Sequence, residues 1–516
     1  MRYRRMSVDQ VKQFAAKYLV KNSRVVVYGV PGEPDFGKPV PTPDKNAPLP
    51  AMKADSVNVD EAWRANRPPS GAAPAMKIPT ANTFKLANGL TVLLDERHNV
   101  PVVSTTVVFR SGTGANPVDK PGLASITLDM LDDGTTTRSA TQFAEQIAQI
   151  GATTRTATTI DANAVTLNVI KSKYEAGLNL IADAVLNPTF PDAELERERQ
   201  NRLGQLAQQR DDAGAIADKV LQLALFGANN PYGYTRLGTE QSIKAFKRDD
   251  LRTFWQENIM PNNAAVLVSG DITATELRTQ LEKAFGNWKP GTPKQITKVA
   301  PAPTTAKLVL VDKPGAQQSQ VRLGLAGPSR LTPDFTGLQV MNDLLGGAFS
   351  SRINLNLREE HGYTYGAFST FTYLRDGGWF YVSSGVRTDV TAPSIREVAR
   401  EMNRIVETNV TASELKMSKD GLAGALPARF ETSDQTVGVL QNIYTFDLGL
   451  DYYSRYATQI PAITDKTVGD NAKKYLTPEK FVYVVVGDKA KIEEEIKKLN
   501  LGAIEYRDAD GKVISK

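Results

Sequence analysis

The sequence contains no cysteine and only two histidines, His98 and His361, among its 516 residues. The absence of cysteine excludes disulfides, thiolate nucleophiles and cysteine-ligated zinc. Histidine is the usual metal ligand and general base near neutral pH, so two histidines about 260 positions apart argue against a complete metal site in this chain. We predict a metal role for neither: His98 falls in a turn between strands, and His361 falls at the end of a helix.

Long apolar runs and blocks of one charge are also missing. No uncharged apolar stretch approaches the roughly 18 residues that cross a bilayer, so no membrane span is predicted. Lys and Arg number 62 against 57 Asp and Glu, giving a net charge of +5, and without a basic block nucleic-acid binding is not predicted. The remaining composition, 41% hydrophobic, is that of an ordinary globular protein, long enough for two or three domains of roughly 100–200 residues.

A proline-rich segment lies close to the N-terminus. Residues 31–81 hold eleven of the 29 prolines, a composition typical of an extended linker. Before it, Ser7 is expected to cap an amphipathic helix from Val8 to Leu19, and a strand is expected at Val25–Tyr28. One helix and one strand cannot bury their apolar faces alone, so we expect them to belong to a larger domain.

This helix-strand unit occurs twice more, as DDLRTFWQENIMPNNAAVLVSG at 249–270 and TDKTVGDNAKKYLTPEKFVYVVVG at 464–487. Repetition at about 200 residues indicates duplicated domains, because solenoid repeats span roughly 20–50 residues. The two later copies end predicted domains. The first copy is therefore expected to close an upstream domain whose body is absent from this chain.

Two bodies with a shared plan precede the later copies. Strands are predicted at 82–109, 163–170, 307–325 and 364–385, and helices at 119–150, 173–186, 192–211, 332–358 and 390–407. The predicted fold class is α+β, with two homologous domains that each have a largely antiparallel sheet and helices packed on one face.

The most informative segment is LLGGAFSSRINLNLREEHGYTYGAF at 344–368. Gly346-Gly347 is expected to form a flexible loop and Ser350 or Ser351 to cap a helix. That helix is expected to run through Arg358 and stop near Gly362, before a strand that begins at Thr364. A helix-borne arginine therefore precedes a strand-borne tyrosine, Tyr365, by seven residues.

This segment resembles the insulinase/pitrilysin family of zinc peptidases, the inverzincins, through Leu357, Arg358, Gly362 and Tyr365. Looser landmarks in the same order are Asn88-Gly89-Leu90, Asn230-Pro231-Tyr232-Gly233 and Pro261-Asn262-Asn263. The resemblance implies half of a peptidase clamshell, in which Arg358 and Tyr365 are catalytic because they stabilise the oxyanion. One such donor typically contributes about 3–4 kcal/mol to the transition state. Gly346, Gly347 and His361 are the predicted substrate-binding neighbours.

The family's zinc signature, G-L-A-H-x-x-E-H-M, is degenerate here. The frame survives as Gly122 to Met130, but Ser125 and Asp129 replace the two histidines and Leu128 replaces the glutamate base. Downstream, Glu198-Arg199 is kept and Gly204-Gln205 replaces the distal ligand region. We therefore expect no zinc in this chain, because a catalytic site needs three protein ligands. Ser125 and Asp129 are expected to be ordinary polar helix residues.

With the resemblance, the chain is predicted to divide into four parts: a closing fragment of a missing upstream domain (1–30), a Pro-rich linker (31–81), a degenerate peptidase-like domain without the zinc motif (82–298) and a C-terminal peptidase-like domain with the Arg/Tyr motif (299–516).

The leading hypothesis is the C-terminal half of a zinc metalloendopeptidase that degrades or processes peptides. Its partner would be a zinc-bearing N-terminal half, and the chain is not expected to be active alone. One alternative is a free-standing inactive subunit of a heterodimeric peptidase that binds a catalytic partner. Another is a non-enzymatic structural or peptide-binding module. The resemblance weakly suggests a periplasmic location, with the cytoplasm as the alternative.

Overall fold

The computed structural model describes residues 5–29, 80–294, 307–408 and 410–515, together with Trp63 and Ile78. The chain forms two compact units, residues 1–72 and 73–516, which are considered separately. Nearly all of the predicted linker (31–81) and the predicted domain boundary at 298/299 lie outside the described residues, so both stay predictions. Among the described residues, no helix is long and apolar enough to cross a bilayer.

The described part of the first unit is mainly one helix, α1 (Val8–Tyr18), followed by a 3-10 turn, η2 (Lys21–Ser23). Ser7 caps α1 as predicted, in a reciprocal capping box with Gln10. The strand predicted at Val25–Tyr28 is wrong, because residues 24–29 form no strand. A strand requires a neighbour that completes its backbone hydrogen bonds, and the described residues of this unit include no other strand.

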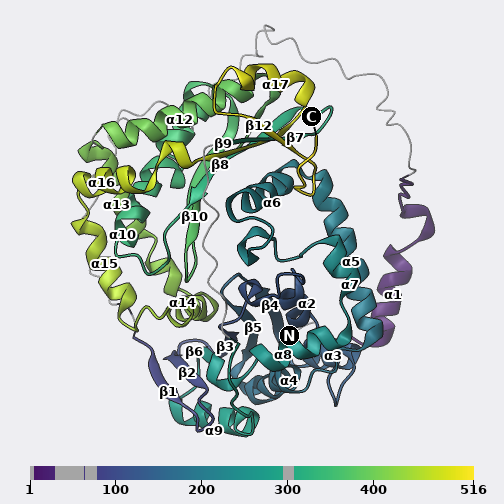
Figure 1. The fold of residues 1–516 in the computed structure, drawn as a ribbon. Coiled ribbons are helices and arrows are strands. Elements are labelled where there is room, and N and C mark those ends of the chain that lie inside the picture. The colour runs from purple at the N-terminus through teal and green to yellow at the C-terminus, as the bar shows by residue number, and fades with distance from the viewer. Residues whose placement is uncertain are drawn as a thin grey trace. The chain divides into compact units, whose positions relative to one another are not determined.

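The second unit contains two six-stranded sheets (Figure 1). The first has the order β1-β2-β6-β3-β5-β4, and only β2 and β6 run parallel. Its strands are β1 (Asn82–Lys85), β2 (Thr91–Glu96), β3 (Val102–Phe109), β4 (Thr153–Thr158), β5 (Asn163–Ile170) and β6 (Ala264–Gly270). β6 is therefore added late in the sequence but lies in the middle of the sheet.

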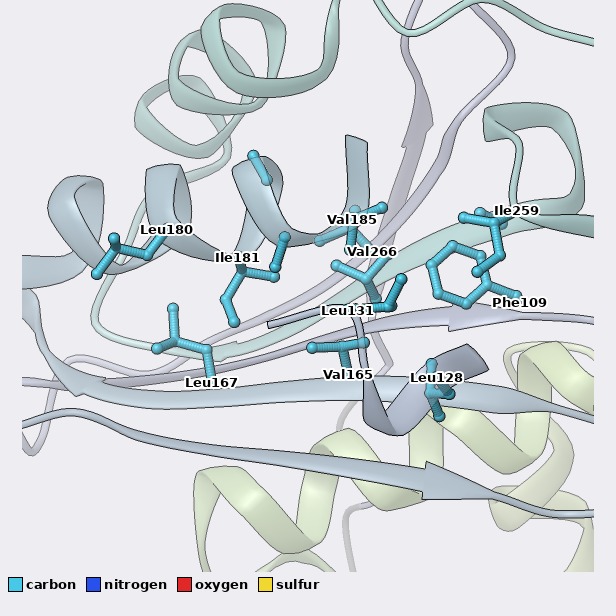
Figure 2. Close-up of a cluster of buried hydrophobic side chains, with 14 of the residues drawn as sticks. Phe109, Leu128, Leu131, Val165, Leu167, Leu180, Ile181, Val185, Ile259 and Val266 are labelled. Carbon is cyan, nitrogen blue, oxygen red and sulfur yellow. The ribbon is translucent and has the colours of Figure 1, made fainter. Parts of the chain in front are cut away.

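We call residues 80–294 the first half of this unit and residues 307–515 its second half. Helices of the first half cover one face of the first sheet and enclose a core, part of which is drawn in Figure 2. They are α2 (Leu123–Asp129), α3 (Ala140–Gln149), α4 (Tyr174–Leu186), α5 (Asp192–Asp211), α7 (Glu240–Ala245), α8 (Arg248–Asn258) and α9 (Ala274–Phe285). The single helical stretch predicted at 119–150 is two helices, because Asp132-Asp133-Gly134 forms a turn and Ser139 then caps α3.

The second sheet repeats the plan with the order β12-β7-β11-β8-β10-β9. Its strands are β7 (Lys307–Asp312), β8 (Gln318–Ala326), β9 (Thr364–Tyr373), β10 (Gly378–Arg387), β11 (Val482–Gly487) and β12 (Ile504–Arg507). Its helices are α10 (Phe335–Asn342), α12 (Thr391–Glu407), α13 (Ala412–Gly424), α15 (Tyr452–Ala462), α16 (Asp465–Tyr475) and α17 (Lys489–Lys497). The predicted α+β class is confirmed.

The other face of each sheet is covered by a helix from the opposite half, which the sequence did not predict. Helix α6 (Ala213–Phe226) packs on β8 and β11 of the second sheet, and α14 (Ser433–Phe446) packs on β3 and β6 of the first (Figure 1). An ion pair supports this exchange, since the exposed Asp218 of α6 lies 2.6 Å from the buried Arg322 of β8. Each half thus completes the other's core.

Charged side chains join the halves at the C-terminal end of α14. Arg110, after β3, and Arg375, before β10, both donate to carbonyls of the last turn of α14 and both pair with Asp447. Cations at a helix C-terminus stabilise it through the helix dipole. Asp161 of the first half accepts a 3.1 Å hydrogen bond from the backbone N–H of Arg375. Burial raises the pKa of the Asp161 carboxyl to about 6.

Candidate functional site

The Arg/Tyr motif lies where an irregular helix meets the edge strand β9. After α10 the chain forms a wide π-helical turn, η9 (Asp343–Gly347). A short helix, α11 (Arg352–Asn354), follows and continues as a second π-helix, η10 (Leu355–Glu360). Both π-helices pack against β9. Local π-helical winding is frequent at functional sites, so this geometry agrees with a site here.

The glycine pair does not form the flexible loop that was predicted. Gly346 and Gly347 end η9, where Gly346 packs against β9. A Cβ on Gly346 would lie 2.6 Å from the backbone nitrogen of Ser369, and one on Gly347 would lie 2.9 Å from the Asn342 amide nitrogen. Glycine is therefore required for close packing. A substrate-binding role for the pair stays a prediction.

The helix that carries Arg358 starts and stops as predicted. Ser351 is its N-cap residue, although its hydroxyl makes no capping hydrogen bond. The helix ends at Glu360, and Gly362 then adopts a left-handed conformation with φ +63°. Strand β9 begins at Thr364, so Tyr365 stands at the start of an edge strand.

Arg358 and Tyr365 both present donors that the protein leaves largely unused. The Arg358 side chain is half-buried, with its guanidinium carbon 4.5 Å from the centre of the Phe349 ring and its Nε 3.4 Å from Glu359 Oε1. Tyr365 is 91% exposed, and its phenol has no hydrogen-bond partner in the part of the chain that the structure describes. Cation–π contact fixes a guanidinium while leaving its N–H groups free to donate.

One buried amide joins the two parts of this site. Asn354, which is buried, donates a 2.6 Å hydrogen bond to the carbonyl of Phe349 and accepts one of 3.1 Å from the Ala367 N–H. The first contact holds the ring under Arg358, and the second holds the strand that carries Tyr365. Sequence reasoning missed this residue, whose only local signal is its position one helical turn before Arg358.

His361 follows directly after η10, and its ring has protein neighbours. It stacks on Tyr363 at 4.8 Å, and its Nε2 lies 3.8 Å from Glu397 Oε2. Its predicted contact with substrate stays a prediction. His98 is exposed in the other half, with Nδ1 2.7 Å from Asp271 Oδ1, which raises its pKa through the hydrogen bond to that carboxylate.

The degenerate zinc motif lies on α2, where an arginine occupies its centre. Arg202 of α5 is 1% exposed and donates hydrogen bonds from all three of its nitrogens. The acceptors are Ser125 Oγ (2.8 Å), Asp129 Oδ2 (2.6 Å) and Glu198 Oε1 (2.7 Å). We name these four residues the Arg202 cluster. Its two carboxylates balance the buried guanidinium, as a buried charge requires.

These residues do not fit a zinc ion. The described part of the chain contains no group of three or more His, Cys, Asp or Glu side chains that could hold a metal. Leu128, in the place of the family's base, is a fully buried core residue and cannot accept a proton (Figure 2). Ser125 and Asp129 are polar residues of α2, as expected, and both bind the guanidinium of Arg202, a contact that the sequence did not predict.

A pocket of about 230 Å³ lies beside the Arg202 cluster, against the edge strand β4. Its residues come from α2 and the turn after it, α3, α4, β4 and β5: Asp129, Leu131, Asp132, Phe143, Thr154, Arg155, Thr156, Val165, Ile181 and Ala184. Burial raises the pKa of Asp132. The pocket combines an apolar floor with charged groups, which is typical of a ligand site.

Comparison with known proteins places this geometry in one family. The family model described as insulinase (peptidase family M16) matches residues 91–240, which include α2 and the Arg202 cluster. A second model, the peptidase M16 inactive domain, matches residues 245–422, which include Arg358 and Tyr365. Together the two matches cover more than half of the chain.

Individual proteins that are similar to this chain point to the same family. A protein of Helicobacter pylori described as the non-peptidase homolog YmxG is 24% identical over 403 residues, covering 78% of this chain and 92% of the relative. The uncharacterized zinc protease YmxG of Bacillus subtilis is 25% identical over 351 residues, covering 68% and 85%. A crystal structure of a peptidase M16 inactive domain from Pseudomonas fluorescens matches with a TM-score of 0.74 and 25% identity, covering 79% and 98%. The chain therefore belongs to the insulinase, or M16, family of peptidases.

Proposed function

We propose that this chain is the non-metal half of an insulinase-family peptidase and supplies Arg358 and Tyr365 to a peptide that is cleaved at a zinc site in another half or subunit. The observation that carries the proposal is the state of the two donors. Tyr365 is almost fully exposed on an edge strand, and the Arg358 guanidinium lies on the ring of Phe349. Donors left free on the surface are suited to a group that arrives from outside the chain.

The proposed chemistry follows from where charge develops during peptide hydrolysis. Attack on the scissile carbonyl places negative charge on its oxygen, and a guanidinium and a phenol both donate strongly to that oxygen. Zinc bound in the other half would supply the activation of water. Arg358 and Tyr365 would bind and polarise the carbonyl, and each is expected to contribute about 3–4 kcal/mol to the transition state.

The same geometry serves a single polypeptide with a zinc-bearing N-terminal half and a heterodimer of separate subunits. In both, this chain would contribute substrate-binding and oxyanion-stabilising residues but no metal. We expect the substrates to be short, unstructured peptides. A periplasmic location, with the cytoplasm as the alternative, remains a prediction that cell fractionation tests.

A non-enzymatic peptide-binding module is the second candidate. The pocket beside the Arg202 cluster favours it, since this pocket lies against the edge strand β4 and the described residues include no group of side chains that could hold a metal. The Helicobacter pylori relative described as a non-peptidase homolog also favours it. If this candidate is correct, the chain binds peptides and substitutions at Arg358 leave all peptide hydrolysis in the cell unchanged.

Steady-state kinetics of the assembled peptidase test the proposal. Arg358→Lys and Tyr365→Phe should each lower kcat about 100-fold or more, because removing one oxyanion donor commonly costs that much, with a smaller effect on KM. Phe368→Leu is the matched control, because Phe368 is an exposed aromatic residue on the same strand with no donor. Unchanged turnover in both variants would exclude Arg358 and Tyr365 from the reaction.

A further inference from the structure

Three segments of the chain share one backbone plan, in which a helix is followed by a 3-10 turn and then by an apolar segment. In two of the three, the apolar segment is a strand of a sheet. Helices α1, α8 and α16 each span 11 residues. In each segment a three-residue 3-10 turn begins three residues after the helix, at Lys21–Ser23, Pro261–Asn263 and Pro478–Lys480. Strands β6 and β11 follow the second and third turns. We name the segments 8–29, 248–270 and 465–487 the closing units.

Apolar side chains of the helices occur at equivalent positions, but only in the second and third closing units are they buried. Positions four and twelve of the unit are Leu251 and Ile259 in the second and Val468 and Leu476 in the third, all 4% exposed or less. In the first unit the same positions are Val11 and Leu19, which are 54% and 81% exposed.

A third equivalent position adds to this pattern. Phe14 of the first unit corresponds to Phe254 of the second, and their exposed fractions are 60% and 3%. Phe254 faces the core of its own domain, where α8 packs against α2. Helix α1 therefore presents the side chains that its counterpart uses for packing, without a covering surface in the described part of its unit.

The segments that follow the 3-10 turns show the same difference in burial between the first closing unit and the other two. β6 and β11 are buried along their whole length, parallel to one neighbour and antiparallel to the other. A strand covered on both faces is apolar throughout, whereas a half-exposed strand alternates. Residues 25–28, Val-Val-Val-Tyr, are continuously apolar and 51% to 91% exposed. Their composition is that of a central strand.

We propose that residues 8–29 form an interaction surface for another domain of the insulinase type. The sheet of that domain would lack the strand equivalent to β6, which lies third in the order of the first sheet. Val25–Tyr28 would enter that sheet parallel to a strand equivalent to β2 and antiparallel to one equivalent to β3. Val11, Phe14 and Leu19 would pack against the helices on the same domain. Strand addition supplies backbone hydrogen bonds and side-chain pockets together. The proposal concerns how this chain holds its partner, and it does not depend on any peptidase step.

A photo-crosslinking amino acid at Val26 tests the proposal in the full chain, expressed in its native cells and analysed by mass spectrometry. The expected crosslink joins Val26 to a strand equivalent to β2 or β3 of an insulinase-type domain other than residues 80–515. The same amino acid at Gln13, an exposed position on the polar side of α1, should give at least tenfold less of that product. Crosslinks only to lipid, to a protein of another fold, or to residues 80–515 would overturn the proposal.

A pair of substitutions provides an independent readout. Val26→Asp should lower the amount of the insulinase-type domain held by the chain at least tenfold, because it places a charge in a buried strand. Gln13→Asp makes the same change in charge on the polar side of α1 and should have no effect. Both residues lie outside the second compact unit, so its melting temperature should not change. Equal retention of the partner domain by the two variants would contradict the proposed strand. Peptidase activity enters neither readout, so a failure here is distinct from a failure of the Arg358 and Tyr365 assignment.

Discussion

Replacing Arg202 with methionine should strongly destabilise the first half of the second unit. Methionine keeps most of the aliphatic stem and removes the guanidinium that binds Ser125, Asp129 and Glu198 at 2.6 to 2.8 Å. Two carboxylates then lose their cation in a site where Arg202 is 1% exposed. Removing one partner of a buried ion pair costs about 3–5 kcal/mol.

The expected loss is toward the lower end of that range. Asp129 and Glu198 keep 24% and 15% of their side-chain surface exposed, so water can partly solvate the carboxylates after the guanidinium is removed. We therefore expect the free energy of unfolding to fall by about 3 kcal/mol. Replacing all three charged residues with apolar ones of similar size should recover most of that loss, because an apolar core avoids the desolvation cost.

Urea unfolding followed by circular dichroism measures these changes, with Arg252→Met on the exposed side of α8 as the matched control. A double-mutant cycle of Arg202→Met with Asp129→Asn should give a coupling energy of about 1–3 kcal/mol, since the two residues are in direct contact. A loss below about 1 kcal/mol for Arg202→Met, together with zero coupling, would refute the assignment of Arg202 as the cation that replaces a metal in this motif.

Three further predictions concern burial and the exchange of helices. Asp161→Asn should stabilise the protein by about 3 kcal/mol at pH 7.5 and by about 1 kcal/mol at pH 4.5 in thermal unfolding, because burial raises the pKa of Asp161 from 3.8 to about 6 and each pKa unit corresponds to about 1.4 kcal/mol. The native state holds its proton more tightly than the unfolded state, so wild-type stability should rise as the pH falls from about 6 to 4; a larger benefit at pH 4.5 would contradict this sign. Gly346→Ala should lower stability by about 1–3 kcal/mol through overlap with Ser369, whereas Gly421→Ala, with open space around it, should not. Residues 299–516 expressed without the first half should aggregate, because α6 no longer covers β8 and β11; a monomeric, cooperatively folded product would contradict the exchange.

The sequence predicted the fold well where local patterns decide it. The strands predicted at 163–170 and 364–385 match β5 and the hairpin of β9 and β10, because the alternation of apolar residues is a local pattern. The exchange of α6 and α14 was not predicted, since a helix's apolar face does not say which sheet it covers. The strand at 25–28 failed for the opposite reason. Its pattern is that of a strand, but a strand needs a paired neighbour, and the described residues of its unit include no other strand.

The candidate site was predictable only as far as its motifs. Arg358 and Tyr365 could be named, and the loss of zinc ligands at Ser125 and Asp129 recognised, only through the resemblance to the insulinase family. Arg202 could not be predicted, because its importance comes from a contact with Asp129, which lies 73 residues earlier in the sequence. Asn354 was missed in the same way, since its two partners are a loop carbonyl and a strand amide.

Peptide hydrolysis and bound zinc, compared for the chain alone and for the chain joined to a zinc-bearing insulinase-family half, test most directly whether the metal lies outside this chain. The purified chain alone should hold no stoichiometric zinc and cleave no peptide. Hydrolysis should appear only in the assembled form, and Arg358→Ala should lower its kcat about 100-fold or more. Chelator-sensitive peptide cleavage by the chain alone would show instead that this chain carries its own metal site.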